Sequence, residues 1–104
     1  MAADDVFEAA VQTLQDDPRV TRVKMFGAPG LKVGGKVFAC LFKGKLVVKL
    51  SQKRVDAIVA SGAGERFDPG MGRRMKEWVA LAPGAAGDWL SLMQEARDFV
   101  ASGL

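Results

Sequence analysis

The sequence predicts an α+β fold in a single domain that spans residues 1–104. Segments with the apolar spacing of helices stand near both ends and in the middle of the chain, and short strand-like segments separate them. A chain of this length matches the usual size of one domain, because two separate cores would leave each half too small. The expected order is a helix, a three-stranded antiparallel meander, a helix, one or two strands, and a helix.

The first helix is expected over residues 5–16. Asp5 and Glu8 have the spacing of a capping box, in which side chains bond the free backbone N–H groups of the first turn. The next apolar residues follow at helical spacing: Phe7, Ala10, Val11 and Leu14. Asp17-Pro18 ends the helix, because proline disfavours helical geometry in the residue before it.

Glycines divide residues 20–50 into the strands of the meander. Residues 27–30 indicate a bulge or a turn, Gly34-Gly35 is typical of a two-residue hairpin, and Gly44 turns the chain again. Residues 37–42 are apolar on both faces, which favours a central strand. The last strand is expected to point three residues inward: Leu46, Val48 and Leu50.

The rest of the chain is expected to form a helix, one or two strands and a closing helix. Ser51 can cap the second helix, which ends at Gly62. Phe67 can anchor a short extended piece, and residues 76–81 have the pattern of a further strand. Asp88 is the expected cap of the closing helix, whose apolar residues have helical spacing: Trp89, Leu92, Met93, Ala96 and Val100.

Three short motifs, in this order of elements, resemble the N-terminal domain of the competence regulator TfoX, also called Sxy. The motifs are Met-Phe-Gly-Ala-Pro-Gly-Leu at 25–31, Gly-Lys-Val-Phe-Ala at 35–39 and Leu-Val-Val-Lys at 46–49. Phe67, residues 75–79 and Trp89 extend the likeness over essentially the whole chain. The resemblance implies a fold shared with YjbR-type proteins and related to secretion chaperones. It also implies a regulatory or adaptor role without catalytic residues.

Composition argues against most enzyme classes. The chain has no His, which removes the commonest general base and metal ligand, and Cys40 lies in an apolar run as an expected buried spectator. Residues 30–36 match the start of a phosphate-binding loop, but Val37 replaces the hydroxyl residue that binds magnesium, and a strand follows instead of a helix. We therefore expect no catalytic residue, no metal, no cofactor and no enzyme activity.

Charge is distributed unevenly along the chain, although the formal net charge is only +3. Residues 1–18 hold five acidic residues and no basic ones, whereas residues 19–54 hold ten basic residues and no acidic ones. A polyanion is therefore expected to meet the middle third of the chain first.

The first hypothesis for a site is a basic face of the sheet that contacts a nucleic-acid backbone or another polyanion. Strand alternation allows five side chains to share the outer surface: Arg22, Lys24, Lys32, Lys45 and Lys49. Binding of this kind would be sensitive to salt and nearly blind to sequence. The alternative is that these lysines only keep solvated strands soluble, since the strands offer few aromatic side chains for stacking.

The second hypothesis places an anion at the start of the second helix. Lys53 and Arg54 lie in its first turn, where the helix dipole disfavours positive charge. Together with Lys49 and Ser51, they could hold a phosphate or a carboxylate. The alternative is that long, solvated side chains simply tolerate a weak dipole.

The sequence leaves the partner open between nucleic acid and protein, and a protein partner could be a second copy of the chain in a homodimer. The acidic N-terminal segment is unlike a secretory or mitochondrial leader, and no apolar stretch reaches the length that spans a bilayer. We therefore expect a cytoplasmic protein without membrane contact.

Overall fold

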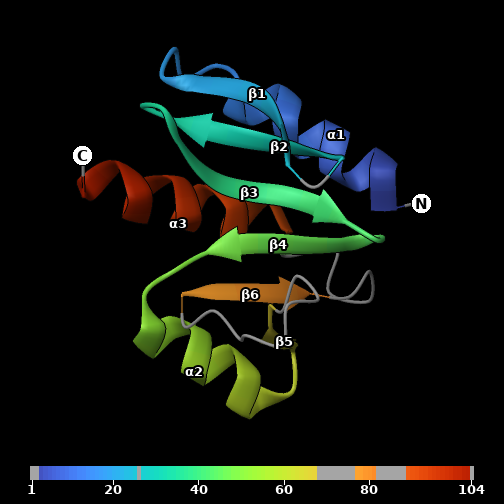
Figure 1. Cartoon of the computed structure of the whole chain (residues 1–104), viewed down its shortest axis with the longest axis vertical. Helices are drawn as coiled ribbons and strands as arrows, with labels where there is room; N and C mark the ends of the chain where they lie inside the picture. Colours follow the sequence, from blue (N-terminus) through green and yellow to red (C-terminus); the bar gives the residue numbers. More distant parts are fainter. Residues whose placement is uncertain (1–2, 26, 68–76, 82–88, 104) are drawn as a thin grey trace.

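The chain folds around one antiparallel sheet of six strands, in the order β1-β2-β3-β4-β6-β5 (Figure 1). The structure is a computed structural model, and it describes residues 3–25, 27–67, 77–81 and 89–103. The strands are β1 (Val20–Met25), β2 (Ala28–Val33), β3 (Lys36–Phe42), β4 (Lys45–Lys49), β5 (Gly64–Arg66) and β6 (Trp78–Leu81). The predicted α+β class is confirmed.

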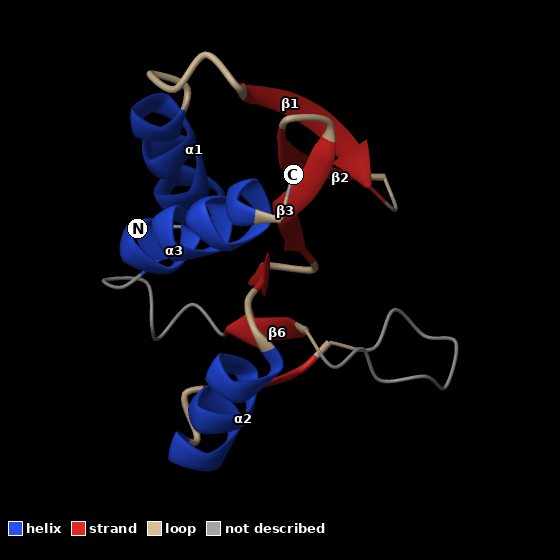
Figure 2. Ribbon diagram, turned by 90° about the vertical axis from the view of Figure 1, so that its left-hand side faces the viewer, coloured by secondary structure: helices blue, strands red, loops and turns tan. Residues whose placement is uncertain are grey.

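All three described helices lie on the same face of this sheet (Figure 2). They are α1 (Ala3–Leu14), α2 (Gln52–Ser61) and α3 (Trp89–Ser102). α2 packs so closely on β5 and β6 that a Cβ atom at Gly64 would lie 2.9 Å from the Ala80 carbonyl oxygen and 3.1 Å from Ile58 Cγ2. The main core therefore lies between the helices and one side of the sheet, with Phe7, Leu31, Leu46 and Trp89 among its fully buried side chains.

We call the opposite side the helix-free face. Directly opposed residues in neighbouring strands share a face, so the register assigns each side chain to one side. Its main residues are Lys32, Cys40, Phe42, Lys45, Val47, Lys49, Glu65, Trp78 and Ala80.

The meander contains four strands rather than the predicted three. Met25 pairs with Ala28, and Gly27 has a positive φ of 75°, so of the two predicted alternatives, a bulge or a turn, the turn forms here and separates two strands. A bulge occurs instead in β3, where the register shifts and Phe38 is the extra residue. Phe38 and Ala39 are both fully buried in the helix-side core, which explains why residues 37–42 are so continuously apolar.

The second helix begins and ends at the predicted residues. The Ser51 hydroxyl accepts a hydrogen bond from the Arg54 backbone N–H at 3.2 Å, and Gly62 follows the helix in the left-handed conformation. The capping role predicted for Asp88, at the start of α3, falls outside the described residues.

Two hairpins have the same two-residue turn built from different residues. Gly34-Gly35 and Lys43-Gly44 all have positive φ, as a type I′ turn requires, and Lys43 is the one non-glycine with positive φ among the described residues. The left-handed region costs an ordinary residue about 1–2 kcal/mol, whereas asparagine tolerates it better. The β3–β4 turn therefore carries backbone strain that the β2–β3 turn avoids.

Replacing Lys43 by Asn should raise the stability of the fold. Relief of the left-handed strain, about 1 kcal/mol, should exceed the loss of the Lys43 ammonium over the Phe42 ring, about 0.5 kcal/mol at an exposed site. The melting temperature should then rise by roughly 2–4 °C in a calorimetric scan. A lower melting temperature would show that the lysine stabilises the turn.

Candidate functional site

The predicted basic face does not form as one surface, because its five residues point to both sides of the sheet. Arg22 pairs directly with Leu31, a fully buried residue of the helix-side core, and Lys24 shares the side of Arg22. Lys32, Lys45 and Lys49 lie on the helix-free face instead.

The shared outer surface is therefore wrong for Arg22 and Lys24. The cause is that Val20, rather than Val23, enters the helix-side core, which turns the even-numbered residues of β1 toward the helices.

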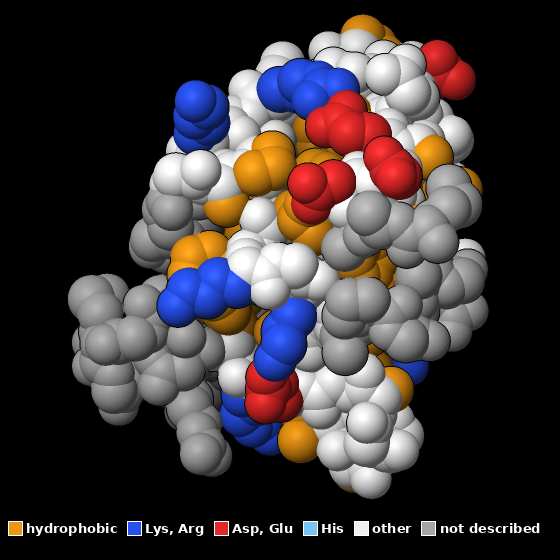
Figure 3. All heavy atoms as spheres, turned by 90° about the vertical axis from the view of Figure 1, so that its right-hand side faces the viewer, with side chains coloured by type: hydrophobic (Ala, Val, Ile, Leu, Met, Phe, Trp, Pro, Cys, Tyr) orange, Lys and Arg blue, Asp and Glu red, His pale blue; other side chains and the backbone are white. Residues whose placement is uncertain are grey.

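Basic side chains are separated on the side of the molecule that Figure 3 shows. Acidic side chains lie in more than one place there, some of them against Lys or Arg side chains, and the Lys and Arg side chains stand in separate groups. Among the residues drawn in colour, no continuous basic patch appears on this side.

Three of the eight predicted site residues are paired with carboxylates of other described residues. Arg22 Nη2 lies 2.8 Å from Glu8 Oε2 of α1, Lys45 Nζ lies 2.6 Å from Glu65 Oε1 of β5, and Arg54 Nε lies 2.9 Å from Glu95 Oε2 of α3. The Arg22 guanidinium lowers the pKa of Glu8, and the Lys45 ammonium lowers that of Glu65. These side chains are exposed, so each pair contributes little stability, but each offsets a positive charge that a polyanion would use.

The predicted anion site at the start of α2 is only partly assembled. The Ser51 hydroxyl already accepts the Arg54 backbone N–H, and the Arg54 guanidinium donates to Glu95 on α3. Lys49 and Lys53 make no ion pair with another described residue. Binding of an anion at this site stays a prediction, with Lys53 as its main cation.

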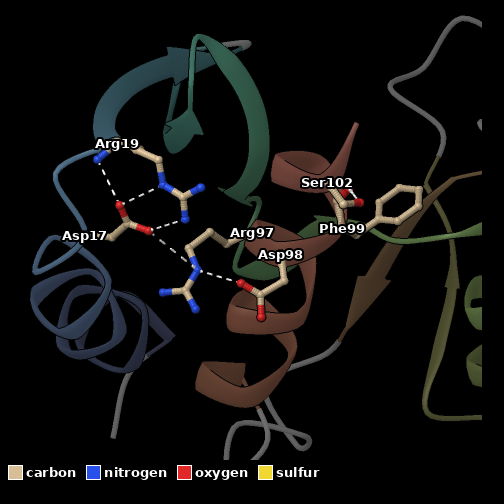
Figure 4. Close-up of polar contacts among 6 residues, drawn as sticks. All are labelled: Asp17, Arg19, Arg97, Asp98, Phe99 and Ser102. Atoms are coloured by element: carbon tan, nitrogen blue, oxygen red, sulfur yellow. Dashed lines mark hydrogen bonds and ion pairs between the residues drawn. The ribbon is translucent and has the colours of Figure 1, made fainter. Parts of the chain in front are cut away.

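A further basic residue of the middle third, Arg19, is held in a charged network that joins the α1–β1 connection to α3 (Figure 4). Asp17 accepts hydrogen bonds from the Arg19 backbone N–H at 2.9 Å and from its guanidinium at 3.1 and 2.8 Å. Arg97 Nε lies 4.0 Å from Asp17 and 3.1 Å from Asp98. The Arg19 guanidinium, helped by its backbone N–H, lowers the pKa of Asp17 to about 2.

The helix-free face carries a second, smaller apolar cluster. Cys40, Val47, Phe67 and Ala80 are buried there, and the half-buried Phe42 and Trp78 pack against them. The Phe42 and Phe67 rings meet edge to face, with centroids 5.5 Å apart and planes at 86°. Aromatic side chains therefore accompany Lys45 and Lys49 on this face, a combination that the strand pattern alone did not predict.

A hollow of about 350 Å³ opens beside this cluster, at the end of the sheet where β3 turns into β4. Its floor includes Val47, Phe67 and Ala80. Lys43 and Lys45 line its edge, and Lys43 Nζ lies 5.3 Å from the centre of the Phe42 ring.

The one cysteine of the chain lies inside the second apolar cluster. Cys40 is fully buried, and burial raises the pKa of its thiol to about 11. Within the described ranges, no group of three or more His, Cys, Asp or Glu side chains could hold a metal ion. Nor does any helix in those ranges have the length and apolar character needed to cross a membrane.

Replacing Asp17 by Asn should lower the free energy of unfolding at neutral pH. In acid the two proteins should be equally stable. Asp17 has a lower pKa in the folded chain, about 2, than its ordinary value of 3.8. The contribution of ionised Asp17 to folding stability is therefore complete above about pH 3.8, and it disappears as the pH falls toward 2. Urea denaturation of both proteins at several pH values measures this, with Asp16→Asn as the control for net charge. A stability difference unchanged down to pH 2 would contradict the role of Arg19.

The Cys40 thiol should react slowly with a disulfide reagent as long as the chain is folded. A pKa raised from 9.0 to about 11 lowers the thiolate fraction roughly 100-fold, and burial blocks access as well. Absorbance after adding a chromogenic disulfide should show one thiol only when denaturant is present. Complete reaction of the native chain within seconds would mean that the second apolar cluster is open.

Comparison with known proteins identifies the family. The sequence model of the TfoX N-terminal domain matches residues 12–101, which is most of the chain. No curated protein and no solved structure matched. The match spans every described strand, α2 and all but the last residue of α3, and it includes only residues 12–14 of α1. The chain therefore belongs to the TfoX N-terminal domain family.

Proposed function

We propose that the chain is a non-catalytic regulatory or adaptor domain that binds a protein partner through its helix-free face, in the cytoplasm. Membership of the TfoX N-terminal domain family supports the regulatory or adaptor type of function. The observation that carries the proposal is the position of Phe42 and Trp78, half-exposed at the rim of the second apolar cluster.

Aromatic side chains on a sheet face favour a polypeptide partner. Protein interfaces are enriched in Trp and Phe at their centre, where water is excluded, and polar residues form the rim. Trp78 lies directly opposite Lys49 on the neighbouring strand, so the indole and the ammonium group would meet the same partner. The basic side chains that the structure describes are too scattered to explain binding by charge alone.

Trp78→Ser should strongly weaken partner binding, while Phe99→Ser should leave it intact. Phe99 is the matched control, because it is a half-buried aromatic on the opposite, helix-covered side. Loss of an interface Trp typically costs about 2 kcal/mol, roughly 30-fold in affinity.

The measurement is comparative capture from a lysate of the source cells with mass spectrometry, after circular dichroism has checked folding. Light scattering during chromatography shows whether the partner is a second copy of the chain. Equal capture of the partner by wild type and Trp78→Ser would refute binding at the helix-free face. Loss of capture with Phe99→Ser alone would refute it as well.

A nucleic-acid backbone is the second candidate partner for the same face. It is favoured by Lys32 and Lys49, which point to the helix-free face and have no carboxylate partner among the described residues. Fluorescence anisotropy with short DNA and RNA should then show binding that weakens steeply with salt and in a Lys32→Gln, Lys49→Gln double variant. Absence of binding at low salt would exclude this candidate.

A further inference from the structure

The hollow at the β3–β4 end of the helix-free face combines an apolar floor with a basic edge. We propose that it binds a small organic monocarboxylate with a flat apolar body, an aromatic acid of about the size of phenylacetate. This inference goes beyond the proposed function and does not depend on it, because the ligand would bind the isolated chain.

The apolar half of the hollow fits a flat ring. Val47, Phe67 and Ala80 are almost completely buried at its floor, and the Phe42 ring stands edge to face with Phe67. A third ring can pack against such an aromatic pair in the same edge or offset geometry. The volume of about 350 Å³ lies at the lower end of the range for small-ligand pockets, which indicates a small ligand.

The backbone holds Lys43 at the edge of the hollow in an unusual conformation. Its φ of 52° is left-handed, and the neighbouring hairpin makes the same turn with two glycines. Strained residues of this kind are concentrated at binding and catalytic sites, where position outweighs stability. Here the strain places the Lys43 ammonium over the Phe42 ring, beside the space that a ligand would fill.

Lys45, the second lysine at the edge, pairs with a carboxylate that a ligand carboxylate could displace. Lys45 Nζ lies 2.6 Å from Glu65 Oε1, and both side chains are largely exposed, at 44% and 67%. An exposed pair is easily broken, so a ligand carboxylate could take the position of Glu65 on Lys45. Glu65 thus acts as an internal competitor for the ligand.

The charges around the hollow favour a ligand that carries a single negative charge. Arg66, which also lines it, is paired with Asp56 of α2, so its charge is already balanced. Among the described residues that line the hollow, Lys43 and Lys45 then face Glu65 alone, which leaves one net positive charge from these residues. A monocarboxylate matches this balance, whereas a phosphate ester would bring a second negative charge and a larger desolvation cost.

The test is an NMR titration of the ¹⁵N-labelled chain with phenylacetate, using the neutral amide phenylacetamide as the matched control ligand. Phenylacetate should shift the amide signals of residues 42–47 and 65–67 with saturation, and a dissociation constant on the order of 1 mM. Phenylacetamide should bind at least about 10-fold more weakly, because it lacks the charged acceptor. Absence of saturable shifts, or equal binding of the two compounds, would overturn the proposal.

Four variants separate ligand recognition from a structural effect. Lys43→Asn and Lys45→Gln should each weaken phenylacetate binding about 10-fold, whereas Glu65→Gln should strengthen it several-fold by releasing Lys45. Lys49→Gln, on the same face but outside the lining of the hollow, should leave the dissociation constant unchanged. If Glu65→Gln weakened binding as much as Lys45→Gln, the ion pair would be structural and the competition would be disproved.

Discussion

The packing of all three described helices on one face of the sheet decides where every strand side chain lies. Because side chains alternate along a strand, a single buried residue in each strand without a bulge fixes the side of all the others. In β4 that residue is Leu46 or Val48, which sends Lys45, Val47 and Lys49 to the helix-free face. In β1 it is Val20, which sends Arg22 toward Glu8 of α1.

Local chemistry made much of the fold predictable from the sequence. The side chain of Ser51 suits the start of a helix, and the backbone freedom of Gly62 suits its end. Each residue lies at that end of α2. Strand β1 shows where such reasoning stops. Val20 and Val23 are an odd number of residues apart, so they lie on opposite faces, and no local pattern tells which one is buried. The tight reversal at Gly27 and the register with β2 decide it, and these are properties of the assembled sheet.

The candidate site depended still more on contacts between distant segments. Phe42 and Phe67 are far apart in sequence and meet because β6 pairs with β4 on one side and with β5 on the other. The order of the strands along the sequence does not show that β6 lies between β4 and β5 in the sheet. The alternation of β4 did predict that Lys45 and Lys49 point outward, but the aromatic residues beside them came from strands whose pairing was unknown. A surface predicted as basic is therefore mixed, with aromatic side chains between lysines that partly have carboxylate partners.

An isotope-edited NOE spectrum of the labelled chain tests most directly which side of the sheet each residue faces. Packing of the helices on one side predicts NOEs from the Arg22 side chain to α1, and from the Phe67 ring to the methyl groups of Val47. NOEs from the Arg22 side chain to that of Lys32 would contradict it, because both residues would then project from the same side of the sheet.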